Sequence, residues 1–115
     1  MQTPGDRACR YALGVDTILY AYAAKEAGDL AGGLHALAED ASTVALTAIE
    51  SGDIESIKAA SLRYAQASVV LRAIAHEARD DLLLAAEGLM EATKDMIEAE
   101  TKRLLMKIHS PAVQS

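Results

Sequence analysis

The sequence lacks residues on which several classes of protein depend. It contains no Phe and no Trp, and its only aromatic residues are four tyrosines. Because nucleobases stack on aromatic side chains, a platform for single-stranded nucleic acid is not expected. The single cysteine, Cys9, excludes an intramolecular disulfide, and we interpret it as a small apolar helix residue. A chain without disulfides fits a reducing compartment, so we expect a cytoplasmic location.

Positive charge is also scarce. The 11 Lys and Arg residues are outnumbered by 17 Asp and Glu residues, which leaves a formal net charge of −6. Nucleic acids and anionic membrane surfaces attract proteins largely through cations, so we expect neither as a partner. The longest apolar runs, at 17–24 and 82–86, are far shorter than the roughly 20 residues that cross a bilayer. The polar start of the chain shows no signal-peptide pattern.

Residues that break helices are rare in the second half of the chain. Between Asp53 and Ser110 there is no proline, and the only glycine is Gly88. Apolar residues recur at every seventh position through this stretch, and His76 is the only polar member of the series. The series is Leu62, Val69, His76, Leu83, Met90, Ile97 and Leu104. A single helix here would contain roughly 55 residues and extend about 80 Å.

The residues that are present favour an all-α fold. Hydrophobic residues make up 51% of the chain, which excludes disorder as a description of the whole sequence. Thr3 and Asp6 flank a proline at the first helical position, and this pattern predicts a helix start with a capping box. Gly28 and Gly52, each followed by Asp, are predicted to end helices in the left-handed conformation.

We therefore predict a single helical domain over residues 1–115, with a frayed tail at 111–115. Two shorter antiparallel helices, at about 4–27 and 30–51, are expected to pack on a long C-terminal helix at about 54–109. The abundance of Ala, Leu, Glu, Lys and Arg is typical of long helices and helical bundles.

The long helix has one point at which it could break. At 79–81 either Asp80 or Asp81 could act as an N-cap, and the chain would then form a four-helix bundle. The sequence favours the continuous helix, because no residue at this point readily ends a helix and the seven-residue series crosses it without a change of phase.

The second half of the long helix carries a narrow apolar stripe, consisting of Leu82, Leu83, Ala86, Leu89, Met90, Met96, Ile97, Leu104 and Ile108. The first half is apolar on several faces, which is typical of a helix surrounded by others. If the two shorter helices cover only that first half, the stripe needs a partner. We predict a non-enzymatic interaction or assembly protein, which acts as a homodimer or as a subunit of a larger assembly and binds a protein partner through this stripe.

The alternative function is a metal- or small-ligand-binding sensor module. His35 and Glu39 are four residues apart, as are His76 and Asp80, so each pair lies on one helix face and offers two ligands to a metal. The Glu-x-x-His motif of di-metal bundles is absent from the sequence. These four residues are the candidates for such a site, although we expect no cofactor.

Motifs of catalysis are missing from the sequence. The Ser and Thr residues have no nucleophile-elbow context, and no glycine-rich loop is present to bind phosphate. Clustered carboxylates such as Glu87 and Glu91 are typical of a solvated acidic face. We expect that the protein is not an enzyme.

Overall fold

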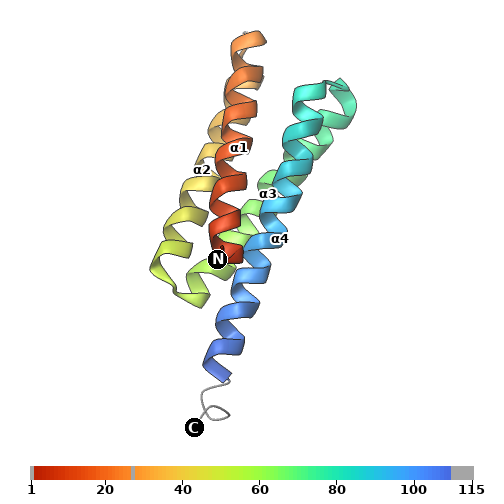
Figure 1. The fold of residues 1–115 in the computed structure, drawn as a ribbon. Coiled ribbons are helices and arrows are strands. Elements are labelled where there is room, and N and C mark those ends of the chain that lie inside the picture. The colour runs from red at the N-terminus through yellow and green to blue at the C-terminus, as the bar shows by residue number, and fades with distance from the viewer. Residues whose placement is uncertain (1, 27, 110–115) are drawn as a thin grey trace.

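The computed structural model describes residues 2–26 and 28–109, and of His109 the backbone only. It contains four helices, α1 (Pro4–Lys25), α2 (Asp29–Ser51), α3 (Ile54–Ala78) and α4 (Asp81–His109) (Figure 1). Each helix packs against the next and α1 also packs along α4, which confirms the prediction of an all-α helical bundle. Within the described residues, no helix has both the length and the apolar character that crossing a membrane requires. The predicted tail at 111–115 lies outside the described residues.

The continuous helix predicted at 54–109 is wrong, because the chain turns back between α3 and α4. Arg79 takes a left-handed conformation, with φ of 53°, and ends α3. Asp80 then caps α4, since its carboxylate accepts hydrogen bonds from the N–H groups of Leu82 and Leu83 at 2.9 and 3.3 Å. Two adjacent residues therefore reverse the chain without a proline or a glycine.

The seven-residue series does not form one continuous face in space. Leu62 and Val69 are 64% and 63% exposed, whereas the members of the series on α4 are buried or partly buried. On α3 a different set, offset by two positions, points into the core: Ile57, Tyr64 and Leu71. The seven-residue series is therefore exposed on the outer side of α3 and buried on the inner side of α4, although its spacing stays even across residues 79–81.

The boundaries in the first half of the chain largely follow the predicted capping signals. Thr3 and Asp6 form the capping box, with both backbone-to-side-chain hydrogen bonds at 3.1 Å. Gly52 ends α2 in the left-handed conformation, with φ of 71°, as predicted. Gly28 differs from the prediction, because its φ of 175° is extended and it precedes α2 rather than closing α1.

Alanine dominates the interior of the bundle, at Ala8, Ala12, Ala31, Ala38, Ala41, Ala45, Ala48, Ala60, Ala67, Ala75 and Ala86. Small side chains allow helices to approach closely, and α1 and α4 have the most extensive contact. Gly14 contributes to this contact, because a Cβ added there would lie 2.7 Å from Cδ2 of Leu89. The close approach of α1 is what covers α4.

A pair of buried hydroxyl groups interrupts this apolar interior. Tyr64 on α3 is fully buried, and neither its hydroxyl nor that of Ser42 on α2 has a hydrogen-bond partner among the described residues. Burial raises the pKa of Tyr64, although the nearby Thr93 and Ser42 side chains oppose this effect. A buried polar group without a partner carries a desolvation cost of roughly 1–3 kcal/mol.

Removing the hydroxyl of Tyr64 should therefore stabilise the protein. We expect Tyr64→Phe to raise the free energy of unfolding by about 1 kcal/mol, because the ring keeps its packing while the unpaired polar group is lost. Urea denaturation followed by circular dichroism measures this change. Tyr22→Phe, at a less deeply buried position, is the matched control and should change stability by less than about 0.5 kcal/mol. Destabilisation by Tyr64→Phe would mean that the hydroxyl is hydrogen-bonded in solution.

The cap formed by Asp80 should make stability depend on pH. The pKa of Asp80 lies below its ordinary value of 3.8, first because of the hydrogen bond from Lys25 at 2.9 Å and also because of the two backbone N–H groups. A lowered pKa in the folded state stabilises the protein above the pKa of the unfolded chain, and this contribution disappears as the pH falls through the folded value.

We accordingly expect Asp80→Ala to lower the thermal unfolding temperature by a few degrees at pH 7. The difference from the unmodified protein should shrink as the pH falls below 4. Asp80→Asn separates the two contacts, because Asn retains the cap but loses the charge that pairs with Lys25. Asp95→Ala, at an exposed site within α4, is the control. An effect of Asp80→Ala that stays the same at all pH values would contradict this account.

Candidate functional site

The stripe predicted to be an interface is part of the chain's own core. Its buried members are Leu83, Ala86, Met90 and Ile97. Leu82, Leu89, Met96 and Leu104 are partly buried and pack against the same core, while Ile108 near the end of α4 is exposed. The premise that α1 and α2 leave this stripe uncovered is wrong, because α1 runs along α4 in the folded chain.

The densest group of exposed apolar side chains lies on the outer side of α3. Leu62, Val69 and Val70 are large and exposed, and Ala59 and Ala73 are exposed as well. Because they are spaced by three, four and seven residues, these five side chains share one side of the helix. We name them the α3 face. The sequence showed that this segment is apolar on several faces, but not that one of those faces is left uncovered.

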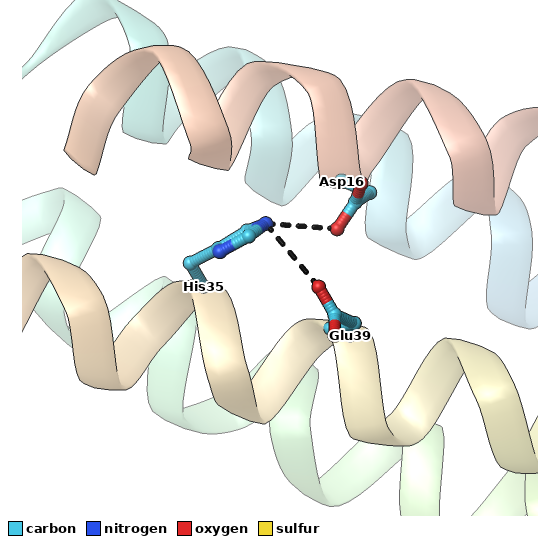
Figure 2. Close-up of side chains that lie close together, drawn as sticks. All are labelled: Asp16, His35 and Glu39. Atoms are coloured by element: carbon cyan, nitrogen blue, oxygen red, sulfur yellow. Dashed lines mark hydrogen bonds and ion pairs between the residues drawn. The ribbon is translucent and has the colours of Figure 1, made fainter. Parts of the chain in front are cut away.

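His35 lies between carboxylates from two different helices (Figure 2). Its Nε2 atom is 2.9 Å from Oδ1 of Asp16 on α1 and 3.7 Å from Oε2 of Glu39 on α2. Tyr20 on α1 packs edge-on against the imidazole, with ring centroids 5.8 Å apart. The predicted pair His35 and Glu39 is thus brought together, and Asp16 joins it. Sequence reasoning missed Asp16, because a residue on another helix leaves no local spacing signal.

A cavity of about 230 Å³ lies next to this cluster, between α1 and α2. Asp16 and Glu39 form part of its wall, along with Ala12, Leu13, Ser42, Thr43 and Leu46. Ser42 is only 6% exposed, and its hydroxyl is one of the two buried groups without a partner. The cavity therefore combines apolar walls with two carboxylates, while the buried hydroxyl of Ser42 lies near that of Tyr64.

The second predicted pair, His76 and Asp80, is not part of such a cluster. His76 is exposed near the end of α3, while Asp80 caps α4 and forms an ion pair with Lys25 of α1. In the part of the chain that the structure describes, the only group of three side chains able to hold a metal consists of Asp16, His35 and Glu39.

Two acidic residues of α4, Glu87 and Glu91, pair with cations of the same chain. Arg72 on α3 donates to Glu87 at 3.0 Å and also to Glu91. Glu91 accepts a further hydrogen bond from Ser68 at 3.0 Å and lies 3.1 Å from Lys94. Glu87 and Glu91 therefore connect α4 to α3 rather than forming the fully solvated face that the sequence indicated.

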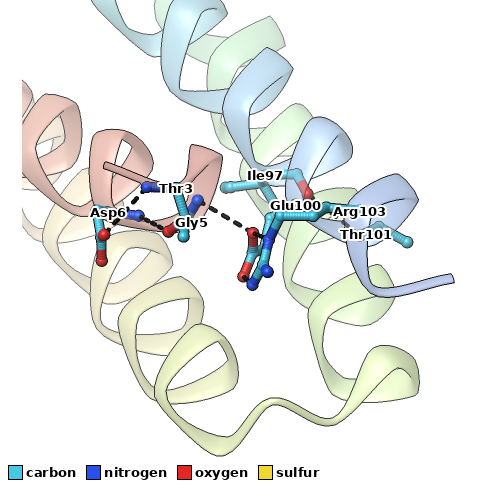
Figure 3. A network of polar contacts seen from close by, with 7 residues as sticks. All are labelled: Thr3, Gly5, Asp6, Ile97, Glu100, Thr101 and Arg103. Carbon is cyan, nitrogen blue, oxygen red and sulfur yellow. Dashed lines mark hydrogen bonds and ion pairs between the residues drawn. The ribbon is translucent and has the colours of Figure 1, made fainter. Parts of the chain in front are cut away.

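A buried carboxylate lies beside the start of α1 (Figure 3). Glu100 on α4 accepts a hydrogen bond from the N–H of Gly5 at 3.4 Å, and Arg103 donates to its two oxygens at 2.7 and 2.9 Å. Negative charge is favourable near the positive N-terminal end of a helix. Gly5 makes the approach possible, because a Cβ there would lie 3.0 Å from Cδ of Glu100. The carboxylate therefore fastens α1 to α4.

No protein-family model matches the chain, and no curated protein or solved structure matches it either.

The contact of Glu100 with α1 should contribute measurably to the free energy of unfolding. We expect Glu100→Gln to lower the free energy of unfolding by about 1–2 kcal/mol, because hydrogen bonds to a charged group are stronger than those to an amide. Glu98→Gln, at an exposed site on the same helix, should change stability by less than about 0.5 kcal/mol. Chemical denaturation of both variants makes the comparison. Equal stabilities would show that the charge of Glu100 does not hold α1 in place.

Proposed function

We propose that this chain is a non-enzymatic assembly protein that forms a homodimer through the α3 face. The exposure of Leu62 and Val69, at 64% and 63%, is the observation that carries the proposal. Both lie in the middle of a helix whose opposite side forms the core, so the bundle itself leaves most of their surface exposed. Clustered apolar side chains on one surface are typical of a site of contact with another protein. The proposal keeps the assembly function predicted from the sequence and transfers it from α4 to α3.

The arrangement of the α3 face favours a second copy of this chain as the partner. Ala59 and Ala73 lie seven residues before and after Gln66, while Leu62 and Val70 lie four residues before and after it. If two copies of α3 cross in antiparallel directions at Gln66, Leu62 of each copy meets Val70 of the other close to the crossing, while the alanines lie farther out, where the helices diverge. A two-fold interface needs a self-complementary surface of this kind, because both chains use the same patch.

The charges beside the α3 face are compatible with such a contact. Arg63 is already paired with Asp40 on α2, and Lys58 lies 3.6 Å from Glu55 within α3. A second copy therefore meets an apolar strip whose neighbouring cations are largely neutralised. Helices that pack through their i±4 ridges cross at about −50°, which separates Glu55 of one copy from Glu77 of the other.

The proposed dimer can be tested with a single charge. We expect the unmodified protein to have the mass of a dimer in light scattering at micromolar concentration, and Leu62→Glu to have the mass of a monomer. A two-fold axis places the new carboxylate in the interface twice, and burying an unpaired charge is strongly unfavourable. Circular dichroism checks that the variant remains helical.

Leu13→Glu is the matched control, because Leu13 is a leucine of similar exposure, 61%, on α1. α1 packs against α2 and α4, on the side of the bundle away from α3. This variant should stay dimeric. A monomeric unmodified protein would overturn the assembly function, whereas an unchanged mass for Leu62→Glu would rule out the α3 face as the interface.

A further inference from the structure

We propose that Asp16, His35 and Glu39 form a binding site for a divalent transition metal, with Zn²⁺ as the ion that fits best. One imidazole nitrogen and two carboxylate oxygens are a donor set that zinc accepts. The site lies between α1 and α2, away from the α3 face, and the inference is independent of the proposed dimer.

The distances within the cluster agree with those that a zinc ion requires. Zinc binds nitrogen and oxygen at about 2.0–2.2 Å, so neighbouring ligand atoms in a tetrahedral site are about 3.3–3.5 Å apart. The distances from Nε2 of His35 are 2.9 Å to Asp16 and 3.7 Å to Glu39, one on each side of that value. All three ligand atoms lie within 4.8 Å of one another. Shifts of a few tenths of an ångström at the ends of these side chains would bring both distances from Nε2 to that value.

The electrostatics of the cluster also favour a cation. One nitrogen of His35 faces both carboxylates, and a neutral imidazole has at most one proton on that atom to share between them. Two carboxylates at this separation repel each other unless a positive charge lies between them. A divalent ion would satisfy Asp16, Glu39 and the imidazole lone pair at once, which a single proton does not.

The cluster is both positioned and accessible. His35 and Glu39 are one helical turn apart on α2, and Tyr20 packs against the imidazole, so the ring has a supported orientation. The side chains of His35, Asp16 and Glu39 are 22%, 39% and 63% exposed, which leaves an entry path and room for a water ligand. Three protein ligands with one open position are typical of accessible zinc sites.

The neighbouring cavity shares two residues with the cluster. Two of the proposed metal ligands, Asp16 and Glu39, are also part of its wall. The buried hydroxyl of Ser42, in the same wall, has no partner among the described residues. That hydroxyl lies near the hydroxyl of Tyr64 and is not exposed to the cavity. A metal at the cluster would therefore have a partly open pocket beside it, with room for a water or small oxygen ligand.

Isothermal titration calorimetry of the full chain, purified without an affinity tag, tests the site with zinc chloride. We expect one Zn²⁺ to bind per chain. His35→Ala and Asp16→Asn should each weaken binding by more than about 10-fold, since even the outer partners of metal ligands contribute 10–100-fold. His76→Ala is the matched control, because His76 also has a carboxylate four residues later but no third ligand from a neighbouring helix. That variant should bind zinc as the unmodified protein does.

Two further measurements separate the metal site from general effects on folding. Co²⁺ bound in place of zinc should give visible absorption bands that His35→Ala abolishes and His76→Ala retains. Saturating Zn²⁺ should raise the thermal unfolding temperature of the unmodified protein, because the ion links α1 to α2, and should leave that of His35→Ala unchanged. Leu62→Glu should bind zinc normally, so failure of the dimer and failure of the metal site are distinguishable. Absence of zinc binding to the unmodified protein, or equal binding by His35→Ala, would overturn the proposal.

Discussion

Asp80 accepts hydrogen bonds from two backbone N–H groups at the first turn of α4, and Arg79 beside it holds a left-handed conformation. The rest of the architecture depends on this reversal. Because α4 returns along the bundle, its apolar stripe meets α1 and α3 instead of extending into solvent. An unbroken helix over 54–109 would have left that stripe to a partner chain. The ion pair between Asp80 and Lys25 connects the same turn to the end of α1.

The reversal also determines which surface is left without a cover. A ring of four helices buries one side of each helix, and α3 has more apolar surface than one buried side can hold. Ile57, Tyr64 and Leu71 enter the core, while Leu62 and Val69 remain outside. Exposed apolar side chains occur on every helix, but on α3 Leu62, Val69 and Val70 lie together on one side. The same ring places α1 beside α2, and it is this pairing that brings Asp16 to His35.

The signals that the sequence revealed correctly are local ones. The capping box at Thr3 and Asp6 needs only four consecutive residues, and the left-handed Gly52 is favoured because glycine lacks the side chain that disfavours positive φ. The pair His35 and Glu39 is likewise predictable, since residues four apart lie on one helix face. Each of these signals needs only a few residues within or at the end of one helix. His76 and Asp80 have the same spacing but do not pair, because α3 ends at Arg79 between them.

The sequence by itself determined that the chain is an all-α bundle and where its first two helices lie. The tertiary structure decided whether α3 and α4 are one helix or two, because a non-glycine residue at positive φ is tolerated only where packing compensates for it, and Arg79 shows no local sign of this. It also decided that Asp16 joins His35, across 19 residues of chain. A seven-residue apolar repeat in the sequence does not indicate which side of each helix faces the core. That depends on how the helices pack against one another.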